Sequence, residues 1–312
     1  MAFAHLKKQD KQVFQALLGE EKRQREGLEM IASENYVSQA VLETLGTVFT
    51  NKYSEGYPGR RYYGGQEYTD AVENLALERA KKLFGAEYAN VQPLSGAMAN
   101  IAAYAALLEP GDTILGMDLS HGGHLTHGHP VTLMSKVYHF VRYKTEADGS
   151  LDYRKLEALA LKEKPKLILA GFSSYTRQLD YAKIAAIAKK VGAFSMMDMA
   201  HIAGLVAGKA LPSPVPYFDV VTLTTHKSLR GPRGGMILAR QEFAAKIDKA
   251  VFPGLQGGPH MNLVAAKAVA FGEALKPGFR SYAKQVLKNA KALEKSFRKE
   301  KADILFGGTE NH

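Results

Sequence analysis

Residues 219–235 read DVVTLTTHKSLRGPRGG, and this stretch guides the interpretation of the whole chain. It opens with an apolar run, residues 219–223, of the kind that forms a buried strand. The run is followed by His226 and Lys227, which lie in a loop rich in glycine and arginine. A lysine at a strand end among hydroxyls and other cations is a candidate Schiff-base former, because desolvation and nearby positive charge lower its pKa toward the nucleophilic amine. The alternative is a surface lysine in a basic loop, and the rest of the sequence argues against it.

Strand-like and helical segments alternate upstream of this stretch. Strands are predicted over residues 88–92, 112–116, 166–172, 193–198 and 218–224. Helices are predicted over residues 70–83, 96–108 and 181–191, the first with Gly85 as its stop signal. Strands separated by helices predict βαβ units, and therefore an α/β fold with a mostly parallel sheet and helices on both faces.

The two ends of the chain differ from this α/β region. The first 30 residues are predicted to be helical, whereas residues 51–65, NKYSEGYPGRRYYGG, hold too many glycines and tyrosines for a regular element. A loop of that length is typical of a functional segment. Residues 303–312 are expected to begin a strand of a further unit.

Composition is that of an ordinary globular protein: 46% of the 312 residues are apolar and 23% are charged. No apolar run approaches the roughly 18 residues that span a bilayer, and the N-terminus lacks the apolar core of a secretory signal. The absence of cysteine excludes disulfides, thiolate metal ligands and a cysteine nucleophile. We expect a cytoplasmic protein that has no membrane partner.

The net charge of +10 raises the question of nucleic-acid binding. Four of the lysines recur at helical spacing and predict the solvated face of an amphipathic helix: Lys284, Lys288, Lys291 and Lys295. No nucleic-acid-binding motif is present, so a nucleic-acid partner is disfavoured.

Three successive predicted strands end in polar side chains, namely Ser173, Asp198 and Lys227. Ligands of open parallel sheets bind at the carboxyl ends of the strands. Taken singly, Ser173 is typical of a turn and Asp198 of a helix cap. Together they meet the needs of pyridoxal phosphate: a carboxylate for the pyridinium nitrogen, a hydroxyl for the ring oxygen and a lysine for the aldehyde carbon.

A phosphate site is predicted at Ser95, Gly96 and Ala97, between a strand and a helix. There the glycine lets the backbone approach closely, and the N–H groups at the positive end of the helix dipole face an anion. Residues 121–129, HGGHLTHGH, carry four histidines and suggest a metal site at first sight. The run contains no carboxylate, so an imidazole stacked on a flat cofactor ring is the favoured interpretation, and no metal is predicted.

Five motifs resemble one family. They are residues 51–65, residues 121–128 (HGGHLTHG), 198–205 (DMAHIAGL), 224–235 (TTHKSLRGPRGG) and 251–259 (VFPGLQGGP). In this order they closely resemble serine hydroxymethyltransferase, from about residue 28 to residue 312. The resemblance implies a fold-type I pyridoxal phosphate (PLP) enzyme that converts serine and tetrahydrofolate to glycine and 5,10-methylenetetrahydrofolate. It also implies a homodimer or tetramer with shared active sites.

The resemblance implies roles in cofactor binding. Lys227 would hold PLP covalently, Asp198 would pair with the ring nitrogen, and His124 would stack on the ring. Ser173 and His201 would approach the ring oxygen. The remaining contacts are expected from Ser95, Gly96 and Ala97 at the phosphate, from Thr224 and His226, and from Tyr53 and Gly258 of the neighbouring subunit.

It also implies roles in substrate binding. Glu55 would be the acid–base group near the serine hydroxyl and the folate, with Tyr63 beside it. Ser33 would touch the amino acid, and Arg233 would support the site around Lys227. The folate site would be lined by Leu119, Gly123 and Leu125.

The sequence departs from the family pattern at three positions. The family usually has His and Gln where this chain has Leu94 and Met98, and glycine where it has Leu255. We expect these changes to weaken cofactor affinity without changing the cofactor. The expected organisation is an N-terminal helical arm (1–50), a large PLP-binding domain (51–277) and the start of an incomplete C-terminal α+β domain (278–312).

In the family, that C-terminal domain carries the arginine that binds the substrate carboxylate, and nothing in residues 1–312 matches it. If the chain ends at residue 312, serine binding is expected to be severely impaired. Two alternatives to the folate enzyme therefore stay open. One is a PLP aldolase for threonine or α-methylserine, and the other is a non-catalytic, dimerising or RNA-regulating paralogue.

Overall fold

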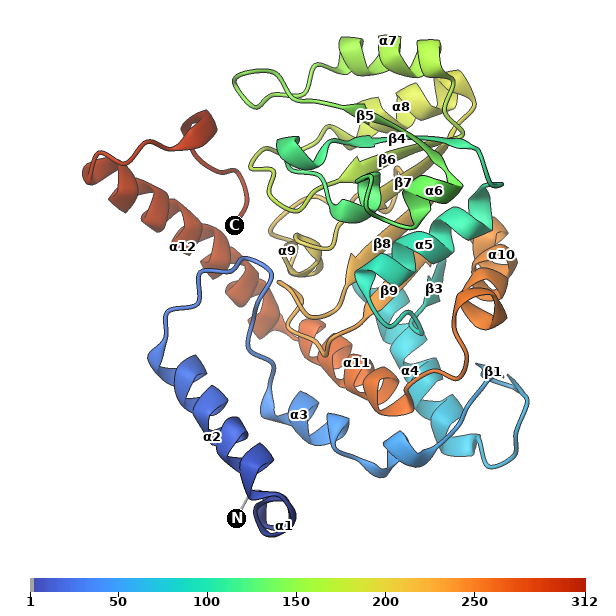
Figure 1. Ribbon diagram of the computed structural model, residues 1–312, viewed down its shortest axis with the longest axis vertical. Coiled ribbons are helices and arrows are strands. Elements are labelled where there is room, and N and C mark those ends of the chain that lie inside the picture. The colour runs from blue at the N-terminus through green and yellow to red at the C-terminus, as the bar shows by residue number, and fades with distance from the viewer. Residues whose placement is uncertain (1–2) are drawn as a thin grey trace.

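A seven-stranded sheet forms the centre of the molecule, and a computed structural model describes it together with the rest of residues 3–312 (Figure 1). The strand order is β3-β9-β8-β7-β6-β4-β5. The strands are β3 (Tyr88–Asn90), β4 (Thr113–Met117), β5 (His139–Tyr143), β6 (Leu167–Gly171), β7 (Phe194–Asp198), β8 (Val220–Thr224) and β9 (Gly235–Ala239). A separate two-stranded hairpin pairs β1 (Gly56–Tyr57) with β2 (Arg60–Arg61).

Neighbouring strands from β5 to β8 run parallel, as predicted. The strand β9 runs in the opposite direction, since it pairs antiparallel with both β8 and β3. Its direction follows from its connection, because residues 225–234 form no crossover helix and adjacent strands without one must be antiparallel. Neither β5 nor β9 was predicted from the sequence as a strand.

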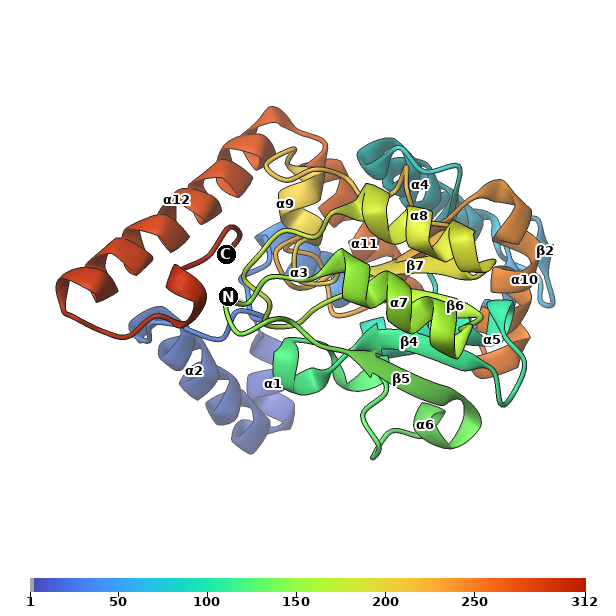
Figure 2. The ribbon, with the colours of Figure 1, turned by 90° about the horizontal axis from the view of Figure 1, so that it is seen from above.

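Helices cover both faces of the sheet (Figure 2). The described helices are α1 (Ala4–Gln9), α2 (Lys11–Glu26), α3 (Gln39–Leu45), α4 (Glu67–Phe84), α5 (Gly96–Leu107), α6 (Met134–Val137), α7 (Tyr153–Glu163), α8 (Tyr181–Val191), α9 (Ala203–Ala207), α10 (Ala244–Lys249), α11 (Met261–Ala274) and α12 (Pro277–Lys299). One core contains side chains of α5, α6 and α10, and the other contains side chains of α4, α7, α8, α9 and α11.

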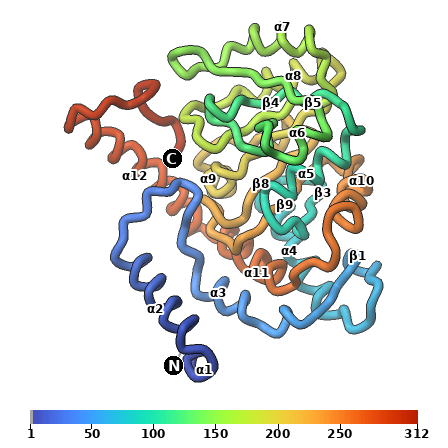
Figure 3. Tube along the Cα trace, viewed as in Figure 1, coloured from blue at the N-terminus to red at the C-terminus, as the bar shows by residue number. Residues whose placement is uncertain are grey.

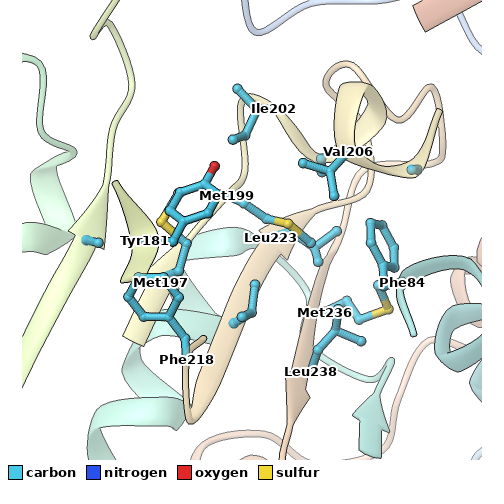
Figure 4. Packing of buried hydrophobic residues seen from close by; sticks show 14 of the residues in the cluster. Phe84, Tyr181, Met197, Met199, Ile202, Val206, Phe218, Leu223, Met236 and Leu238 are labelled. Carbon is cyan, nitrogen blue, oxygen red and sulfur yellow. The ribbon is translucent and has the colours of Figure 1, made fainter. Parts of the chain in front are cut away.

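Alternate residues of each strand enter the two cores, as the pleat requires. In β6, Leu167 and Leu169 belong to the α5 side, whereas Ile168 and Ala170 belong to the other. Figure 4 shows this second core, where strand residues such as Leu223 and Met236 face Phe84 and Val206 of the covering helices. The fully apolar strands predicted from the sequence are therefore buried on both faces, which is typical of a parallel sheet.

The predicted helix ends are confirmed to within one residue, whereas α4 begins at Glu67, three residues before its predicted start. Gly85 ends α4 in the left-handed conformation, with φ of 70°. The side chain of Asp180 accepts a hydrogen bond at the start of α8, and that of Ser95 does so at the start of α5. The four lysines of α12 are all exposed, as the amphipathic pattern predicts.

Two predictions about irregular segments were wrong. Residues 51–65 are not wholly irregular, because they contain the β1–β2 hairpin. Residues 303–312 do not begin a strand: Leu305–Gly307 form a 3₁₀ turn, and Gly307 and Gly308 both have positive φ, a conformation that breaks a strand. The segment instead turns back toward the loops beyond β6 (Figure 3).

The N-terminal arm, α1 and α2, stands beside the rest of the fold (Figures 1 and 3). Neither helix contains a buried residue. Val13, Leu28 and Ile31 leave more than half of their surface exposed, at 52%, 87% and 56%. Within residues 3–312, no helix is both long and apolar enough to cross a membrane.

Candidate functional site

The carboxyl ends of β6, β7 and β8 meet at one cavity of about 470 Å³. Its lining consists of Ser33, Ser95, Gly96, Ala97, His124, Phe172, Ser173, Asp198, Ala200, His201, Thr224, His226, Lys227 and Arg233. These strands are neighbours in the sheet, and Gly171 of β6 lies opposite Asp198 of β7 in the register. Twelve of these fourteen residues were predicted from the sequence as site residues, although they come from segments far apart in the chain; Phe172 and Ala200 were not.

Lys227 lines this cavity and is 9% exposed. The turn that carries it folds back onto β8, because the Gly231 N–H donates to the Thr225 carbonyl at 2.7 Å. Burial lowers the pKa of Lys227; the carboxylate of Asp198 opposes this shift and the nearby Arg233 adds to it. The amine is thus closer to its neutral, nucleophilic form than a surface lysine would be.

Asp198 is buried and its carboxylate is fixed by three donors. Oδ2 accepts from Asn100 Nδ2 at 2.8 Å and from His127 Nε2 at 3.2 Å, and Oδ1 accepts from the Ala200 N–H at 3.0 Å. Burial on its own would raise the pKa of Asp198, but these hydrogen bonds outweigh it and hold that pKa well below its usual range. The cavity therefore has a permanent anion on its wall.

Asn100 and His127, which hydrogen-bond to Asp198, were not predicted from the sequence as site residues. The Thr222 hydroxyl donates to Asn100 Oδ1 at 2.6 Å, which fixes the amide so that its NH₂ group faces Asp198. His127 Nδ1 accepts from the His124 N–H at 3.2 Å, so its proton lies on Nε2 and points to Asp198. Asn100 follows Gly96 by four residues on α5, and this helical spacing was the available signal.

His124 enters the cavity from the histidine-rich loop. Its Nδ1 lies 2.8 Å from the Thr126 hydroxyl, which fixes the plane of the ring. His124, His127 and Asp198 place three potential metal-ligating atoms within 4.8 Å of one another. The Nε2–H of His127 already donates to the Asp198 carboxylate and its Nδ1 accepts from the His124 N–H, so this imidazole has no free lone pair for a metal. The Asp198 carboxylate keeps acceptor capacity for the N–H of an organic ring.

The turn of Ser95, Gly96 and Ala97 starts helix α5 and faces the same cavity. The first N–H groups of a helix have no partner within it and attract anions. A Cβ on Gly96 would lie 2.6 Å from the Thr224 methyl carbon, so glycine is needed for the helix start to approach the end of β8. The predicted phosphate turn thus lies directly beside the strand that carries Lys227.

Glu55, Tyr53 and Tyr63 do not line the Lys227 cavity but form a second cluster. The Tyr63 hydroxyl donates to Glu55 Oε2 at 3.1 Å, and the rings of Tyr53 and Tyr63 meet edge to face at 5.8 Å. Tyr53 and Gly258 line another cavity of about 790 Å³. Leu94, Met98 and Leu255, the three departures from the family pattern, line this second cavity as well.

The hairpin that carries Glu55 is anchored by a buried ion pair. Arg61, with a side chain only 3% exposed, donates to Glu73 at 2.6 Å and to Asp70 at 2.9 Å. The same guanidinium donates to the carbonyls of Ser54 and Gly56, on either side of Glu55. Since both flanking peptides are tied to α4 through Arg61, the position of the Glu55 backbone is well determined.

The predicted folate-lining residues lie on the loop before and after His124. Leu119 and Leu125 are exposed on two 3₁₀ turns, and neither lines the Lys227 cavity. Gly123 lies between them, where a Cβ would meet the Met117 carbonyl oxygen at 2.2 Å. At the C-terminal end, the ring of His312 stacks on that of His201 at 6.1 Å, and Asn311 donates to the Tyr175 carbonyl.

Two histidines of the cavity make stability depend on pH. Burial, with the charge of Lys227 next in size, lowers the pKa of His201 from 6.5 to about 3; burial and the charge of Arg233 lower that of His226 to about 4. Both are therefore neutral in the folded state at pH values where the unfolded chain binds protons. Their contribution is fully present above pH 6.5 and is lost as the pH falls toward the folded values.

We expect the free energy of unfolding of the cofactor-free protein to fall by at most about 5 kcal/mol between neutral pH and about pH 4.5 because of these two groups, and by less to the extent that solvent reaches the two rings. Urea denaturation across this range measures the slope. The double variant His201→Asn, His226→Asn should flatten the slope, and His5→Asn, at an exposed site, is the control. An unchanged slope in the double variant would contradict the prediction.

The family model described as "Serine hydroxymethyltransferase" matches residues 6–312. A curated protein of Koribacter versatilis (strain Ellin345), named "Serine hydroxymethyltransferase", is 59% identical over 308 residues. The alignment covers 98% of this chain and 72% of that protein.

Proposed function

Because this chain belongs to the serine hydroxymethyltransferase family, we propose that it transfers the hydroxymethyl group of serine to tetrahydrofolate, giving glycine and 5,10-methylenetetrahydrofolate. The family depends on PLP and uses tetrahydrofolate as co-substrate. One observation carries the proposal: an amine with a lowered pKa, a buried anion and the start of a helix surround a single cavity.

The donors and acceptors of the cavity fit PLP. Its volume of about 470 Å³ lies in the range of small-molecule sites. Lys227 would hold the cofactor covalently, Asp198 would face the pyridine nitrogen, and the fixed ring of His124 would lie against the cofactor ring. The other contacts would come from Ser173 and His201 at the ring oxygen, from Ser95, Gly96 and Ala97 at the phosphate, and from Thr224 and His226 on the wall.

When bound, PLP supplies an electron sink for the pair of electrons left when a bond to Cα breaks. The Asp198 carboxylate is suited to keep a proton on the pyridine nitrogen, because Asn100 and His127 hold it ionised. Ser33 lines the same cavity and is suited to bind the amino acid. Arg233, also on the lining, adds positive charge beside Lys227.

The second cluster is suited to move the proton of the serine hydroxyl. Breaking Cα–Cβ of serine requires a base for that proton, and a carboxylate can accept it. Glu55 has this chemistry, and Tyr63 donates to one of its oxygens and orients it. Leu119, Gly123 and Leu125 would border the folate.

We propose that a second copy of this chain brings Glu55, Tyr53, Tyr63 and Gly258 to the Lys227 cavity. Support comes from their positions, since none of them lines that cavity in the same chain, and Tyr53 and Tyr63 are 59% and 50% exposed. The unburied arm of α1 and α2 also leaves apolar side chains for a partner to cover. The active unit would be a homodimer or a tetramer of such dimers.

The experiment is to purify the protein with PLP, record its visible absorbance, and add serine with and without tetrahydrofolate. We expect a PLP band that changes on addition of serine, and glycine formation that depends on tetrahydrofolate. No band at saturating PLP would contradict the proposal. A band that does not change on addition of serine or glycine would support a non-catalytic protein. Cleavage of threonine or α-methylserine without folate would support an aldolase.

A further inference from the structure

Helix α11 contains a lysine, Lys267, that is 1% exposed and lies outside the Lys227 cavity. Its ammonium donates to three backbone carbonyls: those of Val91 at 2.5 Å, Pro93 at 3.0 Å and Gly235 at 2.9 Å. An ammonium has three N–H donors, so each of its protons has an acceptor. The geometry is that of a cation enclosed by carbonyl oxygens.

These carbonyls belong to two segments that build the cofactor cavity. Val91 and Pro93 lie in the connection from β3 to the turn of residues 94–97, which contains the phosphate turn. Gly235 is the first residue of β9 and ends the loop that carries Lys227. The segments also touch directly, since the Gly235 N–H donates to the Pro93 carbonyl at 2.9 Å.

The fit around Lys267 requires glycine on the β9 side. A Cβ on Gly234 would lie 2.6 Å from Lys267 Cε, and one on Gly235 would lie 2.2 Å from the Ser95 carbonyl oxygen. Lys267 is therefore packed against Gly234, just before β9. The next residue, Gly235, is packed against Ser95 at the turn that starts α5.

Within the part of the chain that the structure describes, no carboxylate forms an ion pair with the ammonium of Lys267. Burial lowers the pKa of Lys267 from 10.5 to about 7. The negative charge of Glu73 opposes this shift, without a hydrogen bond to the lysine. A buried ammonium without a carboxylate is costly for a fold, and a purely apolar side chain would fill the same core at less cost.

We propose that Lys267 is a positioning residue for the phosphate turn: its ammonium ties residues 91–95 to the start of β9, and so determines how well the cavity binds a phosphorylated ligand. This inference rests on the proposed function, because it takes PLP as the ligand of the cavity. Lys267 acts through the backbone and does not itself line the cavity.

The test compares PLP with pyridoxal, which lacks the phosphate, as ligands of the same cavity. Lys267→Met removes the three donors and the charge, and Lys267→Gln keeps a polar donor if the methionine variant does not fold. Phe271→Leu is the matched control, because Phe271 is fully buried on the same helix and its loss lowers stability without removing a donor. Apparent dissociation constants come from absorbance titrations, and melting temperatures are recorded for the cofactor-free proteins.

For wild type we expect PLP to bind more tightly than pyridoxal. In the Lys267 variants, PLP affinity should fall by about tenfold or more, the loss expected when hydrogen bonds from a charged group disappear, while pyridoxal affinity changes little. Phe271→Leu should lower the melting temperature and keep the preference for PLP. An equal loss for both ligands, or an unchanged preference, would overturn the role of Lys267 and leave the proposed function standing. Wild-type protein that does not prefer PLP would overturn both.

Discussion

Replacing Lys227 by alanine is expected to remove the visible band of covalently bound PLP and to lower turnover by at least about 10³-fold. The reason is structural. Lys227 is the lysine that lines the strand-end cavity, and burial together with Arg233 lowers its pKa toward the neutral amine. Borohydride reduction followed by peptide mapping checks the attachment site, and should label the peptide that contains residue 227 in wild type only.

The control for this variant is Lys276→Ala, at an exposed lysine outside the cavity. It should retain both the band and the activity. A labelled peptide elsewhere in the Lys227→Ala protein would show that another lysine holds the cofactor. Lys267 would be the first to consider, although all its protons are committed to carbonyls.

Replacing Glu55 by glutamine is expected to lower serine cleavage by about 10²- to 10⁴-fold while leaving PLP binding intact. Glutamine has nearly the same shape, and it can accept the Tyr63 hydrogen bond through its amide oxygen, but it cannot take the serine hydroxyl proton. The measurement is steady-state turnover with serine and tetrahydrofolate, alongside a PLP titration. Glu67→Gln, at an exposed site at the start of α4, is the control.

The same two variants test whether the active site is shared between subunits. If Glu55 serves the partner's Lys227 cavity, mixing Lys227→Ala with Glu55→Gln subunits creates one intact site in each mixed dimer. Random exchange makes half of the dimers mixed, each with one of two sites intact, so about one quarter of wild-type activity should return. No recovery after demonstrated subunit exchange would mean that Glu55 and Lys227 act within one chain.

Sequence patterns predicted the elements whose signal is local. The apolar runs of β6, β7 and β8 are continuous because both faces are buried, and their ends carry Ser173, Asp198 and Lys227. Cap residues such as Gly85 then fixed helix ends to within one or two positions. The meeting of these three side chains at one site was predictable, since the carboxyl ends of parallel strands lie on one edge of the sheet.

Residues that contact the site only through other residues have no comparable local pattern in the sequence. Asn100 lies in an alanine-rich helix and contacts Asp198, which is 98 positions further along the chain. Lys267 is surrounded by alanines and valine on α11, where its charge suggests an exposed position rather than a buried one. β9 is short, and its direction depends on how residues 225–234 turn back. Long-range packing decided each of these features.

The cavity shared by Leu94, Met98 and Leu255 has a consequence for how sequence differences in this protein are compared with those of its relatives. Mutational effects at sites that share a cavity are not additive, because each side chain is part of the surroundings of the others. A histidine placed at residue 94 alone would share that cavity with two apolar side chains, those of Met98 and Leu255. The effect of a single substitution at any of these positions is therefore expected to depend on which residues occupy the other two.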